Sequence, residues 1–77
     1  MKVSILNILI MAKIQLNGSK IELKNKYSIF TLLKKYKLES KKIAVELNGK
    51  IINGNKHKTV FLKDKDKIEI VHFIGGG

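Results

Sequence analysis

Residues 12–23 read AKIQLNGSKIEL and carry the pattern that decides the fold. Apolar and polar side chains alternate on both sides of Asn17-Gly18, and this period of two is typical of half-buried strands. Asn-Gly is the strongest short signal for a two-residue hairpin, because a type I′ turn needs a positive φ at both central residues. The stretch therefore predicts an antiparallel hairpin with one buried face.

A short helix is predicted directly after the hairpin. Ser28 is a suitable N-cap, because its hydroxyl can accept a hydrogen bond from a free amide of the first turn. The positions that follow at i, i+3, i+4 and i+7 form one apolar stripe, which would face a sheet: Ile29, Leu32, Leu33 and Tyr36. Three lysines fall in the expected last turns, where they complement the negative end of the helix dipole: Lys34, Lys35 and Lys37.

The rest of the chain adds strands to the same sheet. Residues 43–48 alternate again, Asn48-Gly49 offers a second turn, and residues 50–52 supply a short return strand. Residues 57–62 are expected to form a short strand or an irregular segment. The last strand, 67–74, becomes apolar on both faces, which favours a central position. One helix can cover only one face, so we expect an α+β roll with a four- or five-stranded sheet.

Size and charge limit what the protein can be. Its 77 residues form one small domain, which excludes a multidomain enzyme with a large pocket of its own. Sixteen lysines, no arginine and six acidic residues give a net charge of +10. That charge suits an anionic partner, but the lysines are scattered and arginine, the residue that clamps phosphate, is absent. We interpret the lysines as a solvated surface, with a nucleic-acid-binding module as the remaining alternative.

Metal and thiol chemistry find little support. The chain contains no cysteine, and its two histidines, His57 and His72, are fifteen positions apart. A zinc site needs a closer set of nitrogen and sulfur ligands. We therefore expect no metal and no cysteine nucleophile within this chain.

The first residues, MKVSILNILIM, differ from everything that follows. They are shorter than the roughly 20 apolar residues of a membrane span, and they lack a small-residue cleavage site. We interpret residues 1–10 as an extension from a start codon assigned too early, with an extra strand or a disordered arm as the alternatives. The domain is then 11–74, followed by a flexible glycine tail at 75–77.

The tail is where chemistry is expected. Gly75, Gly76 and Gly77 cap no helix and join no second element, so a frayed end is the simplest alternative. In the functional interpretation, an arm without side chains brings an ionised α-carboxylate into a narrow active site of another protein. A carboxylate is a poor acyl donor, so a partner would first convert it to a mixed anhydride with a nucleotide phosphate. A sulfur or nitrogen nucleophile could then attack that acyl adenylate.

The ending EIVHFIGGG at 69–77 resembles that of the ThiS family, the sulfur carriers of thiamine biosynthesis. The turns at Asn17-Gly18 and Asn48-Gly49 and the charged segment 63–66 also fit, and the resemblance covers residues 11–77. It implies a ubiquitin-like β-grasp fold with a mixed sheet, and a cytoplasmic carrier protein that is not an enzyme. Terminal Gly-Gly also occurs in ubiquitin-like modifiers and in the molybdopterin synthase small subunit. A carrier for molybdopterin or tRNA thiolation, or a protein-conjugating modifier, is therefore the alternative.

The resemblance also implies a reaction cycle in which Gly77 is the covalent position and Gly75 and Gly76 thread into partner active sites. A ThiF-like adenylyltransferase would activate the carboxylate with ATP. A sulfur donor such as a cysteine desulfurase would convert the acyl adenylate to a thiocarboxylate, and a ThiG-like thiazole synthase would take the sulfur. The chain itself would bind no cofactor and contribute no catalytic residue.

Partners must also grip the body of the domain to place the tail. Val71, Phe73 and Ile74 are candidates for an apolar docking patch, with burial in the core as the alternative. His72 is expected to be structural or interfacial, and the lysine surface could meet acidic partners. We expect a monomer when free, without nucleic-acid or membrane partners.

Overall fold

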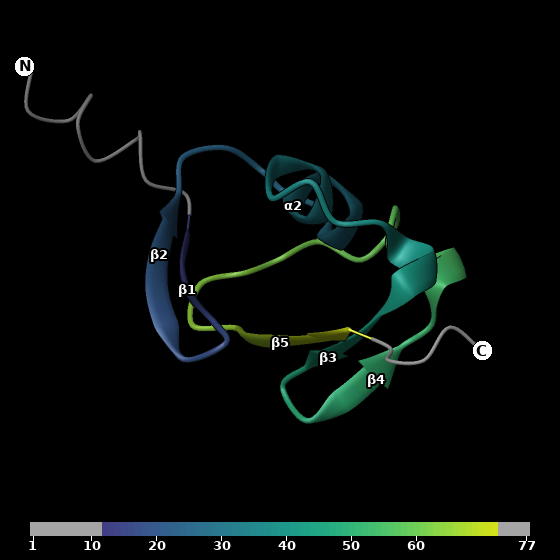
Figure 1. The fold of residues 1–77 in the computed structure, drawn as a ribbon. Helices are drawn as coiled ribbons and strands as arrows, with labels where there is room; N and C mark the ends of the chain where they lie inside the picture. Colours follow the sequence, from purple (N-terminus) through teal and green to yellow (C-terminus); the bar gives the residue numbers. More distant parts are fainter. Residues whose placement is uncertain (1–11, 73–77) are drawn as a thin grey trace, which may run out of the picture.

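The computed structural model describes residues 12–72, and its ribbon is shown in Figure 1. The expected extension at 1–10 and the positions 73–77, which include Phe73, Ile74 and the glycine tail, lie outside the described residues. The elements in chain order are β1 (Ala12–Leu16), β2 (Ser19–Leu23), α2 (Ile29–Lys35), the 3₁₀ turn η1 (Ser40–Lys42), β3 (Ile43–Leu47), β4 (Lys50–Ile52), the 3₁₀ turn η2 (Gly54–Lys56) and β5 (Lys67–His72).

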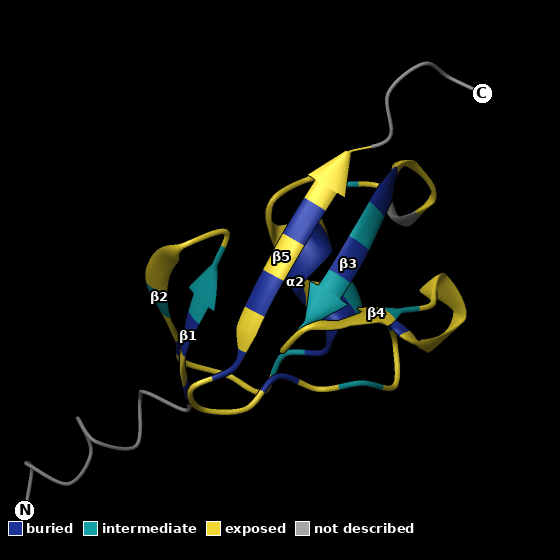
Figure 2. Ribbon diagram, turned by 90° about the horizontal axis from the view of Figure 1, so that it is seen from below, coloured by how far each residue is buried: buried dark blue, intermediate teal, exposed yellow. Residues whose placement is uncertain are grey.

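The strands form one mixed sheet in the order β2-β1-β5-β3-β4. β5 is parallel to β1 and antiparallel to β3, so the last strand lies between the two hairpins, as expected from its apolar sequence. Helix α2 lies across one face of this sheet (Figure 1), and Figure 2 looks onto the opposite, open face. The sheet has five strands, the upper of the two numbers we expected.

Both predicted hairpin turns are confirmed. Asn17 and Gly18 have φ values of 49° and 86°, and Asn48 and Gly49 have values of 51° and 88°. Each pair connects directly opposed strand residues, Leu16 with Ser19 and Leu47 with Lys50. Positive φ at both central residues is the type I′ geometry that Asn-Gly accommodates.

The predicted cap and most of the helical stripe are confirmed. The amide of Thr31 donates to Ser28 Oγ at 3.0 Å, and Ile29, Leu32 and Leu33 are buried. The burial predicted for Tyr36 is wrong, because α2 ends at Lys35 and Tyr36 is the C-cap, with 41% of its surface exposed. Lys37 was predicted to lie in the last turn, but it follows the helix.

Lys37 closes the helix in a left-handed conformation, with a φ of 58°. Its amide donates to Lys34 O at 3.0 Å, and the amide of Leu38 donates to Leu33 O at 2.9 Å. This is the Schellman arrangement, in which glycine usually occupies the left-handed position. The sequence contains lysine there, which explains why the helix end was placed too late.

Residues 57–62 form an irregular segment beside the start of α2. Their one ladder contact is an isolated bridge between Ser28 and Phe61. The amides of Ile29 and Phe30 donate to Val60 O and His57 O at 3.0 and 2.9 Å, which satisfies two free donors of the helix start. His57 is 2% exposed, so this segment completes the core between α2 and the sheet.

The hydrophobic core lies between α2 and the sheet. β5 contributes to it through alternate residues, as the banding in Figure 2 shows. The buried apolar side chains of the whole core are Ala12, Ile14, Leu23, Ile29, Leu32, Leu33, Ile43, Val45, Leu62, Ile68 and Ile70.

Candidate functional site at the end of β5

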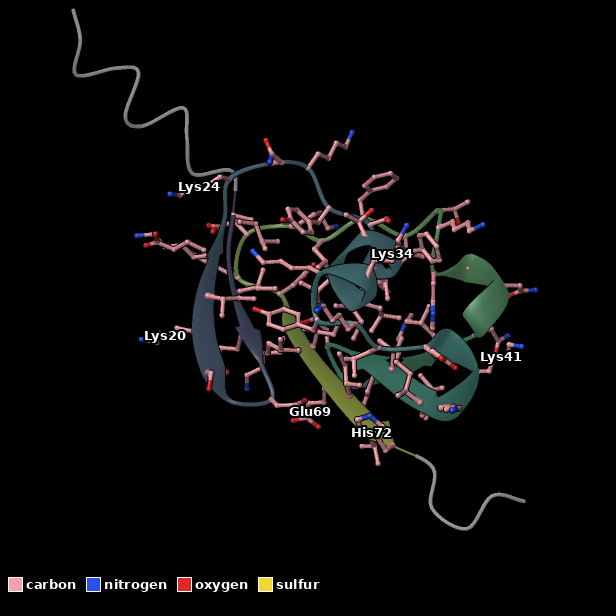
Figure 3. All side chains as sticks on the ribbon, turned by 45° about the horizontal axis from the view of Figure 1, so that its top comes forward. Lys20, Lys24, Lys34, Lys41, Glu69 and His72 are labelled. Carbon is pink, nitrogen blue, oxygen red and sulfur yellow. The ribbon has the colours of Figure 1, made fainter. Side chains whose placement is uncertain are left out.

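The candidate site is the end of β5. Val71, one of the predicted docking residues, lies in this strand, and the other two, Phe73 and Ile74, follow it in sequence with the glycine tail. Ile68 and Ile70 are buried, whereas Lys67, Glu69 and Val71 project from the open face. Val71 is 62% exposed, so burial in the core is the wrong interpretation for this residue. His72 is also exposed, and Figure 3 places it at the tip of the β5 arrow, apart from Glu69.

The side chain of Asn17 holds this end of β5. Its Oδ1 accepts a hydrogen bond from the Ile70 amide at 2.7 Å, and its Nδ2 donates to Ile70 O at 3.2 Å. The backbone hydrogen bonds from the β1 side to β5 end at the Asn17 amide, which donates to Ile68 O at 2.9 Å. The Asn17 side chain therefore extends the parallel β1–β5 ladder by one step, toward the tail.

The second turn asparagine holds the other end of the same strand. Asn48 Oδ1 accepts from the Lys67 amide, and its Nδ2 donates to Asp66 Oδ1, each at 2.8 Å. The buried Asp66 carboxylate also accepts from the Lys63 amide at 2.7 Å. Each hairpin thus attaches to β5 through its Asn-Gly turn, one at the start of the strand and one near its end.

The open face beside Val71 combines apolar and acidic groups. Val71 lies opposite Ala44, and Glu69 lies opposite Glu46, on neighbouring strands of the antiparallel pair. Ile51, 69% exposed, lies opposite Glu46 on the other side. Directly opposed carboxylates destabilise a sheet, and exposed apolar side chains are typical of interaction sites when they gather. Val71 near the end of β5 and Ile51 on the edge strand β4 are therefore two exposed apolar side chains on this face.

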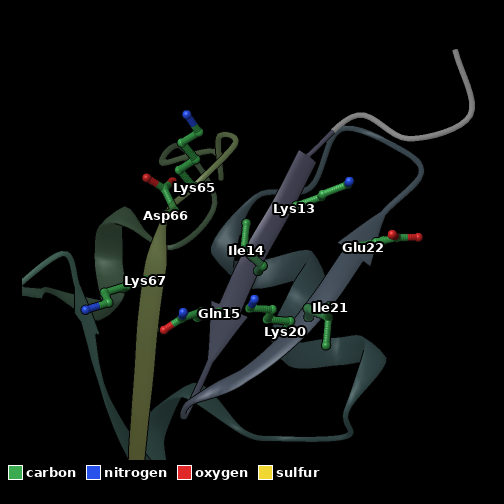
Figure 4. A pocket seen from close by; sticks show the side chains of 9 residues that line it. All are labelled: Lys13, Ile14, Gln15, Lys20, Ile21, Glu22, Lys65, Asp66 and Lys67. Atoms are coloured by element: carbon green, nitrogen blue, oxygen red, sulfur yellow. The ribbon is translucent and has the colours of Figure 1, made fainter. Parts of the chain in front are cut away.

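A broad hollow of about 750 Å³ opens on the same side of the sheet, between β1, β2 and the start of β5. Figure 4 shows its lining side chains, among them Lys13, Lys20 and Lys65, spreading away from one another. A small-molecule site needs polar groups that converge on a ligand. The hollow lies at the Lys67 end of β5 and not at the His72 end, so it does not belong to the tail.

The described part of the chain was also compared with the requirements of a metal site and of a membrane helix. Among residues 12–72, no three His, Asp or Glu side chains are grouped to hold a metal ion. No helix in the same range is long and apolar enough to cross a membrane.

A mixed five-stranded sheet with one helix across a face, whose central last described strand is fixed at both ends by asparagine side chains, is a β-grasp architecture. The sequence model of the ThiS family matches residues 8–77. The chain is 46% identical over 65 residues to the sulfur carrier protein ThiS of Bacillus subtilis, covering 83% of this chain and 98% of that one. The chain therefore belongs to the ThiS family.

Two further similarities extend this result. The crystal structure of the thiamine biosynthesis protein ThiS from Geobacter metallireducens superimposes with a TM-score of 0.73 at 26% identity, over 84% of this chain and 99% of that one. A thiazole synthase of Paramagnetospirillum magneticum is 37% identical over 65 residues, which are 84% of this chain but only 20% of that protein. The β-grasp fold expected from the sequence is confirmed.

Of the predicted site residues, the structure places only Val71, whereas Phe73, Ile74 and Gly75 to Gly77 lie outside the described residues. Sequence reasoning recognised both Asn-Gly turns but missed the second role of their asparagine side chains. A turn that needs only left-handed backbone could use Gly-Gly. The signal in the sequence for this second role was that both turns have asparagine, and not glycine, at their first central position.

Proposed function

We propose that this chain carries sulfur as a thiocarboxylate on Gly77 and delivers it to the thiazole ring of thiamine. The role of sulfur carrier in thiamine biosynthesis is that of its family, and it rests on the match to almost the full length of the Bacillus carrier. The reacting atom, the enzymes that act on it and the docking surface are the proposal. The related molybdopterin and tRNA-thiolation alternatives are not favoured by these similarities.

The chemistry begins at the carboxylate. One of its oxygens attacks the α-phosphorus of ATP in the active site of a ThiF-like adenylyltransferase, and pyrophosphate leaves. A persulfide from a donor such as a cysteine desulfurase attacks the acyl carbon and displaces AMP. A thiol of a partner then attacks the donor cysteine's sulfur in the resulting acyl disulfide, which breaks the S–S bond, forms a disulfide between partner and donor, and leaves the thiocarboxylate on Gly77. This chain supplies no thiol, because it contains no cysteine.

A thiazole synthase is the proposed acceptor. In the Paramagnetospirillum protein, a region similar to this chain makes up one fifth of a thiazole synthase. A thiazole synthase of Magnetococcus marinus contains a similar region, 37% identical over 65 residues. Joining two proteins in one polypeptide raises their effective concentration for each other, which supports a direct transfer between carrier and synthase.

The body of the domain aligns the tail for these partners. Val71, with Phe73 and Ile74 after it in sequence, is proposed to form the apolar contact, and Gly75 and Gly76 to thread through a narrow channel. Fixing β5 at Ile70 leaves only two described residues between the clamp and position 73. The free carrier is proposed to be a cytoplasmic monomer that binds no cofactor, since ATP is bound by its partner.

The test is intact-mass analysis after incubation with ATP, the adenylyltransferase and a sulfur donor. The expected product is heavier by the difference between one sulfur and one oxygen. Two variants, one lacking Gly77 and one with an added alanine after it, should keep the circular dichroism spectrum and lose the mass change. A mass change in either variant, or none in the unaltered protein, would contradict the proposal.

A further inference from the structure

Most of the net positive charge lies in two segments of the chain that meet beside the start of α2. The helical layer, defined as residues 24–38 and 53–63, contains eight exposed lysines and no acidic residue. The other described residues contain seven lysines and all six acidic residues. Nearly all of the net charge of residues 12–72 is therefore carried by the helical layer.

The same layer contains every aromatic residue of the described chain: Tyr27, Phe30, Tyr36 and Phe61. Lysine ammonium groups lie over three of these rings. Lys26 Nζ is 5.1 Å from the centre of the Phe61 ring, and Lys35 Nζ is 5.6 Å from that of Tyr27.

Phe30 has ammonium groups from both segments of the layer. Lys34 Nζ, from α2, is 5.6 Å from the ring centre, and Lys58 Nζ, from the irregular segment, is 4.8 Å from it. Cation–π contacts of this length favour the positions the ammonium groups occupy. The two segments therefore form one continuous surface, in which four lysine ammonium groups lie over aromatic rings.

This arrangement is unfavourable for the isolated protein. Within residues 12–72 the one ion pair joins Lys42 to Glu39, outside the helical layer, so none of the eight lysines contacts a carboxylate. Like charges gathered on one surface repel one another and destabilise the folded state. The carboxylates next to the layer in sequence interact elsewhere, since Glu39 pairs with Lys42 and Asp64 accepts a hydrogen bond from the Lys13 amide.

We infer that the helical layer is a docking surface for a protein partner whose own surface is rich in carboxylates. Charge complementarity supports this occupant, since ordered ammonium groups lose less side-chain entropy when they pair with carboxylates. Single-stranded nucleic acid fits less well. Bases stack on open aromatic faces, and here lysines lie over the rings of Tyr27, Phe30 and Phe61, which leaves Tyr36 as the one aromatic ring of the layer without a lysine over it. The layer lies on the face of the sheet opposite Val71, so the inference does not depend on sulfur chemistry at the tail.

The test uses the full chain and two labelled probes, a polyglutamate peptide and a single-stranded oligouridylate of equal charge. One variant combines four substitutions in the layer: K26Q, K34Q, K35Q and K58Q. Its control removes the same charge elsewhere: K13Q, K20Q, K50Q and K67Q. Fluorescence anisotropy gives the affinities, and amide shifts of the unaltered protein locate the bound peptide.

Polyglutamate should shift the amides of residues 24–38 and 53–63. Its affinity should fall about tenfold in the layer variant and by no more than about threefold in the control. Equal losses in the two variants, amide shifts spread over the whole surface, or tighter binding of oligouridylate than of polyglutamate would each overturn the inference. Because the shift map uses the unaltered protein, the test survives even if a variant unfolds. The mass assay of the tail is unaffected by any of these outcomes.

Discussion

Replacing Asn17 by glycine should destabilise the domain by removing the side-chain clamp while keeping the turn. Glycine adopts a φ of 49° without strain, so the backbone of the hairpin is preserved. The two hydrogen bonds to Ile70, at 2.7 and 3.2 Å, are lost. At about 0.5–1.5 kcal/mol each, the free energy of unfolding should fall by about 2 kcal/mol.

For a domain of this size the same loss corresponds to a decrease in melting temperature of about 10 °C. Circular dichroism during heating and during urea titration measures it. Hydrogen exchange should localise the effect, because the Ile70 amide loses its acceptor while the Ile68 carbonyl keeps the bond from the backbone of residue 17. The Ile70 amide should therefore exchange faster by a larger factor than the core amides of α2.

Lys65→Gly is the matched control. Lys65 also has a positive φ, 73°, and its side chain makes no hydrogen bond to β5. The substitution adds the same unfolded-state entropy without removing a clamp, so stability should be unchanged or slightly higher. If Asn17→Gly loses no more stability than Lys65→Gly, the clamp contributes nothing and the reasoning is refuted.

Three further predictions concern the proposed apolar contact at Val71 and the two ends of α2. Val71→Asp should weaken binding to a thiazole synthase about tenfold at an unchanged melting temperature, because the side chain is 62% exposed; Ile51→Asp, on the edge strand, is the control, and equal losses would argue against a contact at the tail. Lys37→Gly should raise the free energy of unfolding by about 0.5–1 kcal/mol in urea titration, since it relieves a left-handed lysine, and a decrease would contradict this. Ser28→Ala should lower it by about 1 kcal/mol through loss of the cap; no change would show that the cap is dispensable.

Sequence reasoning succeeded where one local rule acts alone. Asn-Gly between alternating strands specifies a hairpin, Ser28 followed by an apolar stripe specifies a helix start, and an apolar last strand specifies a central position. It failed at Tyr36 and Lys37, where a left-handed lysine ends the helix although the apolar spacing continues. Local capping hydrogen bonds, from the Lys37 amide to Lys34 O and from the Leu38 amide to Leu33 O, close the helix there, and apolar spacing does not encode them.

The site was predictable only in part, for a similar reason. The exposure of Val71 depends on which face α2 covers, and alternation in a strand that is apolar on both sides does not specify that face. The Asn17–Ile70 clamp joins residues 53 positions apart in sequence, and the Asn48–Lys67 clamp joins residues 19 positions apart. Both therefore become visible only once the strands are placed side by side. The helical layer was missed because its two lysine-rich segments, 24–38 and 53–63, come together only in the fold.

The central position of β5 has a consequence for the order of folding. Each hairpin is local and can form as soon as its own residues have left the ribosome, but the two share no ladder with each other. Until Lys67–His72 arrives, β1 and β3 each have an unpaired inner edge, and such edges are sites of wrong pairing and aggregation. Long-range pairing of this kind slows folding. Joining of the sheet must therefore wait for the strand that leads to the tail, so a partner that binds the end of β5 would meet that surface only on molecules that have finished folding.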